Sequence, residues 1–218
     1  MHPVKETPRR PYRGETADER AGRRRAVLIE AAFALVAAEG WRQLRIERIC
    51  GEAGLNKRYF YESFDDLDAV IGAVMRRLAD EAIDVTLGAL DPSAPDDKLV
   101  HRAVSALVRH LTDDRRRARV LFGATPAGEA ASAHRAAAIR KIVAAAAEQS
   151  RSHHAIADDP VIELSAAMLV GGTSQALLDW LDDPRAVPRD MFIDELAALW
   201  QIIGDGAGKR ARRRAPGA

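Results

Sequence analysis

The sequence predicts an all-α protein with a small N-terminal domain of three helices and a larger C-terminal helical domain. Apolar residues recur at helical spacing through most of the 218 residues, whereas alternating patterns and β-branched runs are scarce. With 47% hydrophobic residues, the chain can bury a substantial core. We place the domains at 21–80 and 81–204, between an irregular arm (1–20) and a basic, disordered tail (205–218).

The first helix is expected over residues 23–39, where apolar residues occupy one face. Gly40 follows at the position where a glycine commonly ends a helix. Thr16 and Glu19 have the spacing of a capping box, which allows an earlier start.

Two short helices follow, joined by a tight turn. The second helix begins near Arg45 and ends at Gly54, and its inward face carries Ile46, Ile49, Cys50 and Ala53. Asn56 is a good N-cap for the third helix. Phe60 and Phe64 are four residues apart, so both point into the core.

The remaining chain reads as six further helices. Asp66 can cap a long fourth helix, and turn residues separate the others. The later helices are expected at 96–112, 115–123, 128–152, 160–182 and 188–203.

Composition narrows the classes of function. The 33 Lys and Arg nearly balance the 32 Asp and Glu, so any signal for nucleic acid must be local. The single cysteine, Cys50, is expected to pack in the core, and no segment resembles a signal peptide or a membrane span, so a cytoplasmic protein is expected. The histidines lack the spacing of a metal site, and neither a nucleophile elbow nor a phosphate-binding glycine loop occurs. We therefore expect no catalytic residue, metal or cofactor.

The most informative segment is the pair of short helices at 45–64. Two such helices joined by a glycine turn, and packed on a preceding helix, have the geometry that places a recognition helix in the major groove of DNA. Many purely structural helix pairs share this pattern, and the charges of the third helix could also form a solvated face.

Residues 23–75 resemble the N-terminal domain of the TetR family of bacterial helix-turn-helix transcriptional regulators. The resemblance rests on the segment 28–32 with Leu35, Gly40 and Trp41, on the turn at 49–57, and on Tyr61 and Phe64. It covers about a quarter of the chain. Arg45 and Arg58 depart from the family's usual threonine and glycine, and Leu67 stands where lysine is common.

The resemblance implies contacts with double-stranded DNA. Base edges would be read by Lys57, Arg58 and Tyr59, because Arg and Lys suit guanine, and tyrosine can contact a thymine methyl group. Phosphate and sugar would be contacted by Tyr61, Arg45 and Asn56. The basic residues before the first helix would follow the backbone or enter the minor groove, namely Arg24 with Arg20, Arg23 and Arg25. Exposed amides at the start of the fourth helix would bind a further phosphate, although Asp65 and Asp66 oppose this.

The resemblance also implies a homodimer formed by the last two long helices, with Leu164, Gly172, Leu196 and Trp200 at the interface. The middle helices would enclose a cavity for a small organic effector, with His110, Phe122, Met168, Gln175 and Trp180 in its lining. Some of the aliphatic residues Val74, Leu78, Leu107, Leu111 and Leu121 would line it as well. The alternative for each of these apolar residues is the plain core of one chain.

Taken together, the sequence predicts a dimeric, sequence-specific transcriptional regulator that binds a palindromic operator, in the form of a repressor released by a small molecule. A ligand-independent regulator or an activator of the same fold remains open. A helical enzyme or interaction protein is the alternative from another class.

Overall fold

The computed structural model of the protein describes residues 16–90, 96–123, 129–156 and 158–214. These residues form nine α-helices and one short 3-10 helix, with no strand among them, which confirms the predicted all-α class. The helices are α1 (Ala17–Glu39), η1 (Trp41–Gln43), α2 (Ile46–Ala53), α3 (Lys57–Ser63), α4 (Leu67–Gly88), α5 (Asp96–Asp113), α6 (Arg115–Phe122), α7 (Glu129–His154), α8 (Pro160–Asp182) and α9 (Arg189–Arg214).

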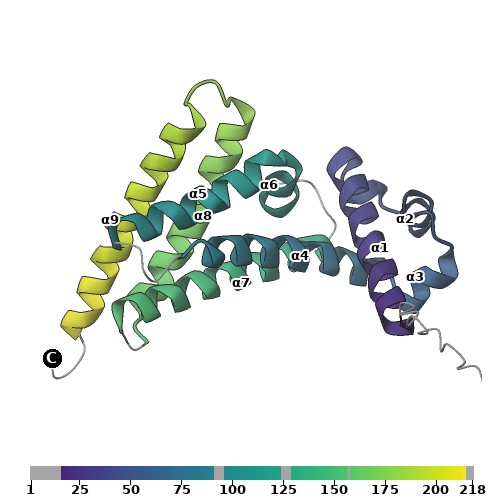
Figure 1. The fold of residues 1–218 in the computed structure, drawn as a ribbon, viewed down its shortest axis with the longest axis horizontal. Helices are drawn as coiled ribbons and strands as arrows, with labels where there is room; N and C mark the ends of the chain where they lie inside the picture. Colours follow the sequence, from purple (N-terminus) through teal and green to yellow (C-terminus); the bar gives the residue numbers. More distant parts are fainter. Residues whose placement is uncertain (1–15, 91–95, 124–128, 157, 215–218) are drawn as a thin grey trace, which may run out of the picture.

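The helices are arranged along one long axis, as Figure 1 shows. Helices α1, α2 and α3 gather at one end, and the hairpin of α8 and α9 lies toward the other. Helices α4 and α7 lie side by side between these ends, and α5 crosses α9 and packs on it. The long α4 is therefore shared by both ends of the molecule.

Helix α1 begins at Ala17, earlier than the predicted start at residue 23. The reason is a complete capping box: Thr16 Oγ1 accepts from the Glu19 amide at 3.1 Å, and Glu19 Oε2 accepts from the Thr16 amide at 2.7 Å. The last residues of the expected arm are therefore helical. Residues 1–15 of that arm lie outside the described residues.

A buried cluster holds the N-terminal helices together. Leu28 of α1, Ile49 of α2, Phe60 of α3 and Val70 of α4 are all fully buried. Cys50 belongs to the same cluster, as expected, and burial raises the pKa of its thiol. The cluster continues through α4 into Val120 and Leu121 of α6, so the N-terminal core merges with the C-terminal helices.

The predicted disordered tail from residue 205 is wrong for residues 205–214, because α9 continues to Arg214. Three glycines between 204 and 208 lower the local helix propensity and suggested an end. Packing overrides this preference, since Ala207, Gly208 and Ala211 are buried, the two alanines in a cluster with Ile162 of α8. The tail residues 215–218 lie outside the described ranges.

Candidate functional site

The turn between α2 and α3 has the conformation that its sequence requires. Gly54 is left-handed (φ 63°, ψ 28°), a region that residues with a Cβ rarely adopt. The Leu55 amide donates to the Cys50 carbonyl at 2.9 Å, and Asn56 Oδ1 caps α3 by accepting from the Tyr59 amide at 3.2 Å. The expected N-cap is confirmed, and its side-chain oxygen is thereby already engaged.

The inner face of α3 is anchored by two phenylalanines. Phe60 and Phe64 are buried, with ring centroids 5.8 Å apart. Arg25 of α1 lies over the Phe64 ring at 4.1 Å and donates to the Ser63 carbonyl at 3.1 Å. These contacts determine which residues of α3 face outward.

The outer face of α3 presents two cations and one tyrosine to solvent. The side chains of Lys57 and Arg58 are 56% and 83% exposed, and Tyr61 is 56% exposed. The rings of Tyr61 and Phe60 meet edge to face at 5.5 Å, which orients the tyrosine. A partner of α3 could therefore reach all three side chains.

Both cations have carboxylate partners that the sequence reasoning missed. Lys57 Nζ lies 2.5 Å from Glu47 Oε1 of α2, and Arg58 Nε lies 3.0 Å from Glu62 Oε1. The hydrogen bond from Lys57 lowers the pKa of Glu47, and the same bond raises the pKa of Lys57. The i,i+4 spacing of Arg58 and Glu62 was a visible signal, whereas the Lys57–Glu47 pair depends on how α2 and α3 pack.

Tyr59 and Arg24, which the sequence predicts to contact DNA, are less accessible than Lys57, Arg58 and Tyr61. The Arg24 guanidinium stacks on the Tyr59 ring at 4.7 Å and lies 3.6 Å from Glu62. Both side chains are partly buried where α1 meets α3. Arg24 therefore braces α3 in this structure.

Arg45 remains exposed just before α2. Its guanidinium donates to the Arg42 carbonyl at 2.8 Å and to the Leu44 carbonyl at 2.7 Å, which holds it at the end of η1. The start of α4 is different, because Asp66 Oδ1 caps it by accepting from the Ala69 amide at 2.8 Å. With Asp65 and Asp68 nearby, that helix start is acidic, which disfavours the expected phosphate contact.

A second candidate site is a cavity of about 190 Å³ enclosed mainly by α4, α5, α7, α8 and α9. Of the residues predicted to line it, Phe122, Leu107 and Leu111 do so. Val74, Leu78 and Leu121 do not, because they are buried in the cluster that holds the N-terminal helices. The lining also contains polar residues that the sequence reasoning missed, namely Gln149, Ser150, His153, His154, Gln201 and Asp205. Asp205 was missed because it lies beyond the expected end of α9.

Three of the predicted ligand residues do not line the cavity, because they lie on outward faces or in another cluster. Met168 is 61% exposed on α8. Gln175 is exposed and donates to Asp179 at 2.8 Å. Trp180 stacks on Phe192 with centroids 5.6 Å apart and donates to the Val187 carbonyl at 2.8 Å.

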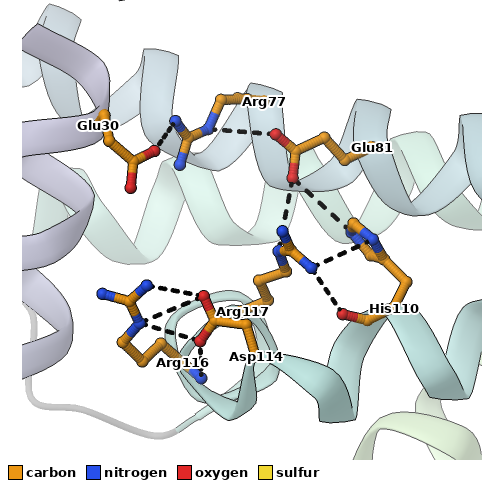
Figure 2. Close-up of polar contacts among 7 residues, drawn as sticks. All are labelled: Glu30, Arg77, Glu81, His110, Asp114, Arg116 and Arg117. Atoms are coloured by element: carbon orange, nitrogen blue, oxygen red, sulfur yellow. Dashed lines mark hydrogen bonds and ion pairs between the residues drawn. The ribbon is translucent and has the colours of Figure 1, made fainter. Parts of the chain in front are cut away.

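His110 does not line the cavity either and instead joins a polar network between helices (Figure 2). Its Nε2 lies 3.7 Å from Glu81 Oε2 of α4, and Arg117 of α6 donates to the His110 carbonyl at 3.0 Å. Burial, followed by the charge of Arg117, lowers the pKa of His110.

The four residues predicted at a dimer interface divide into two pairs. Leu164 is 61% exposed, and Gly172 is also exposed, so both are accessible on α8. Leu196 is buried against the chain's own core, and Trp200 donates to Thr173 Oγ1 at 2.9 Å. Helix α9 instead exposes Met191, Leu199 and Ile202.

Helix α8 is also the one described helix that is long and apolar enough to cross a membrane by length and composition, with a mean hydropathy of 1.4. Such a helix is weak evidence for a span, because core helices of globular proteins pass the same test. Here α8 packs against α6, α7 and α9, and part of its apolar surface stays exposed.

Solved structures of TetR-type transcriptional regulators share this fold. A TetR-family regulator from Syntrophomonas wolfei has a TM-score of 0.70 at 11% identity, over 85% of this chain and 96% of the other. A TetR-family regulator from Streptomyces coelicolor has a TM-score of 0.67 at 19% identity, over 89% and 90%. SmeT in complex with triclosan has a TM-score of 0.63 at 16% identity, over 84% and 91%. No family model matches the chain, and no curated protein matches it by sequence.

Proposed function

We propose that this chain, which has the fold of TetR-type regulators, is itself a member of that family and a dimeric, sequence-specific DNA-binding protein. The observation that carries the proposal is the outer face of α3, where Lys57, Arg58 and Tyr61 are exposed while Phe60 and Phe64 anchor the helix. A solvated charged face is the alternative, but it does not explain an exposed, oriented tyrosine between two cations on the second helix of a helix-turn-helix.

In this proposal α3 enters the major groove. Lys57 and Arg58 donate to guanine edges, and Tyr61 contacts the backbone. Arg45, exposed beside α2, supplies a further phosphate contact, and Tyr59 and Arg24 hold α3 in place. Lys57 and Arg58 must leave Glu47 and Glu62 when DNA binds. The two carboxylates therefore lower the affinity for any duplex whose contacts with the cations do not replace the lost ion pairs.

The proposed dimer uses the exposed apolar face of α8 and α9. Successive exposed positions on α8 include Leu164, Met168 and Gly172, at helical spacing on one side. Met191, Leu199 and Ile202 form the corresponding stripe on α9. An isologous dimer buries both stripes and places two α3 helices about 34 Å apart, so the operator is palindromic.

The cavity supports the proposal of a small-molecule effector. A ligand there is enclosed by α4, α5, α7, α8 and α9, and α4 connects directly to the N-terminal helices. A ligand that binds more tightly to a conformation in which the two α3 helices are too far apart for successive major grooves would release the dimer from its operator. We therefore propose a repressor of the cytoplasmic, ligand-released type.

The test is selection of bound fragments from a random DNA pool with the full-length chain, followed by binding at several salt concentrations. We expect a symmetric consensus, and log K falling with log[salt] at about −0.9 per phosphate contacted. Lys57→Ala and Arg58→Ala should each lose about 1 to 3 kcal/mol of discrimination at one position of the half-site. Lys141→Ala, an exposed lysine on α7, is the control. No enriched sequence, or equal losses in all three variants, would contradict the proposal.

A further inference from the structure

The cavity is apolar over most of its wall and polar where α7 ends and α9 passes. Three of its hydroxyl groups are engaged within their own helices: those of Thr86, Ser165 and Ser174 donate to backbone carbonyls at 2.6, 2.9 and 2.7 Å. Thr173 accepts from Trp200. The polar groups left to meet a ligand are therefore concentrated on the last turns of α7 and around Asp205.

Asp205 is the one carboxylate among the described residues that line the cavity. Gln201 Nε2 donates to Asp205 Oδ1 at 3.0 Å, and this orients the carboxylate. Gln201 Oε1 is buried and has no hydrogen-bond partner in the described structure. Gly204 leaves space beside them, since a Cβ there would meet nothing within 4 Å. The carboxylate of Asp205 thus adjoins an open volume, whereas Gln201 Oε1 is itself buried.

The described wall of the cavity contains no lysine or arginine. Arg151 of α7 is engaged by Glu148 and Glu163, and Arg212 of α9 lies 3.5 Å from the His154 carbonyl. Burial, then the charges of His153 and Arg212, lowers the pKa of His154, outweighing the opposite effects of the Asp205 charge and a hydrogen bond to the Gly204 backbone. An anionic ligand would find no lysine or arginine on the described part of this wall.

We propose that the cavity binds a lipophilic amine, with its apolar body among the aliphatic side chains of α4, α5 and α7 and its ammonium group against the Asp205 carboxylate. The ammonium group donates to the Asp205 carboxylate, which has acceptor capacity beyond the bond from Gln201, and its charge is paired as it leaves water. A carboxylate of the same length would instead lose its hydration beside another carboxylate, which is unfavourable on both counts. This amine would be the effector of the proposed regulator. Its binding to the cavity does not depend on that function, but its effect on DNA binding does.

The experiment compares three probes with one alkyl chain: decylamine, 1-decanol and decanoate. Isothermal titration calorimetry of the full-length protein at pH 7 measures each affinity without DNA. We expect decylamine to bind at least about tenfold more tightly than either other probe, as for a hydrogen bond to a charged group. Binding of decylamine no tighter than that of 1-decanol, or failure of all three probes to bind, overturns the proposal.

Asp205→Asn removes the charge and keeps the shape and the acceptor for Gln201. It should weaken decylamine about tenfold and leave 1-decanol unchanged. Asp194→Asn, on the same helix but paired with His101 outside the cavity, is the matched control. An unchanged affinity of Asp205→Asn for decylamine contradicts the assignment. Thermal melting without ligand checks that both variants fold; should Asp205→Asn not fold, Gln201→Leu decides, with weaker decylamine binding expected.

Failure of this inference can be told apart from failure of the proposed function. If decylamine binds preferentially but no DNA sequence is selected, the ligand class of the cavity stands and the proposed regulatory function is contradicted. If a DNA sequence is selected but decylamine neither releases it nor binds more tightly than the other probes, the amine proposal is contradicted and the regulatory function stands.

Discussion

Arg77 of α4 donates to Glu30 of α1 at 2.6 Å, and its guanidinium lies 5.1 Å from the centre of the Phe33 ring. The same guanidinium lies 3.5 Å from Glu81, whose other oxygen faces His110 of α5 and Arg117 of α6 (Figure 2). A continuous set of charged contacts thus joins the helix that supports α3 to the helices around the cavity.

Arg77→Ala should therefore lower the free energy of unfolding by about 1 kcal/mol, through the lost cation–π contact and ion pairs. It should also weaken the effect of a cavity ligand on DNA affinity, because α1 and α4 lose a direct tie. Lys141→Ala, which breaks an ion pair with Asp80 between α7 and α4, is the control. Denaturant unfolding and DNA titration with and without ligand provide the two measurements, and equal behaviour of both variants would count against a coupling role.

Glu47→Gln should increase DNA affinity. The carboxylate neutralises Lys57 in the free protein, and it would also repel phosphates close to α3. Removing it leaves one more unpaired cation, so the slope of log K against log[salt] should steepen by up to about 0.9. Fluorescence anisotropy with a labelled duplex measures both quantities, with Asp80→Asn as the distant control. Weaker binding by Glu47→Gln would show that Glu47 itself contacts DNA.

Phe60→Ala should mainly lower the stability of the protein, whereas Tyr61→Phe, at the next residue, should mainly lower its affinity for DNA. Phe60 is fully buried, so its truncation should cost about 3 to 5 kcal/mol of stability. Tyr61 exposes 56% of its surface, and loss of its hydroxyl should leave stability within about 0.5 kcal/mol while reducing DNA affinity. Denaturant midpoints and DNA titration test the pair. A large stability loss in Tyr61→Phe would assign the tyrosine to the core.

His110 should make the protein less stable in mild acid. Burial, then Arg117, lowers its pKa below 6.5, outweighing the opposite effects of Glu81, Asp113 and Asp114. Between the folded and unfolded pKa values the unfolded chain binds the extra proton, so stability rises with pH through this window and falls as pH drops below about 6.5. His110→Gln should lose less stability than the parent protein between pH 7.5 and 5.5, measured by urea midpoints. An identical pH dependence would exclude this origin.

Leu199→Glu should convert the proposed dimer to a monomer, because it places a charge in the exposed apolar stripe of α9. Val27→Glu, at an exposed apolar position on α1, is the matched control. Sedimentation velocity at micromolar concentration distinguishes the two species. A monomeric parent protein, or a dimer in both variants, would remove the α8–α9 interface.

Local patterns predicted the helices well because each has its own signals. The caps Asn56 and Asp66 and the left-handed Gly54 act within a few residues, so their positions are readable along the chain. The cavity was harder. Of its predicted lining only Phe122, Leu107 and Leu111 were placed correctly. Helical spacing shows that apolar residues share one face of a helix, but it does not show whether that face meets the cavity, the core or solvent.

The sequence by itself determined the helical class, the turn at Gly54 and the anchoring of α3 by Phe60 and Phe64, since these follow from backbone preferences and helical periodicity. Tertiary structure alone decided that Glu47 meets Lys57, that Arg24 covers Tyr59, and that α9 continues past its glycines to bring Asp205 to the cavity. The physical reason is that these contacts join residues on different helices, and packing energy there outweighs the local preferences that a sequence displays.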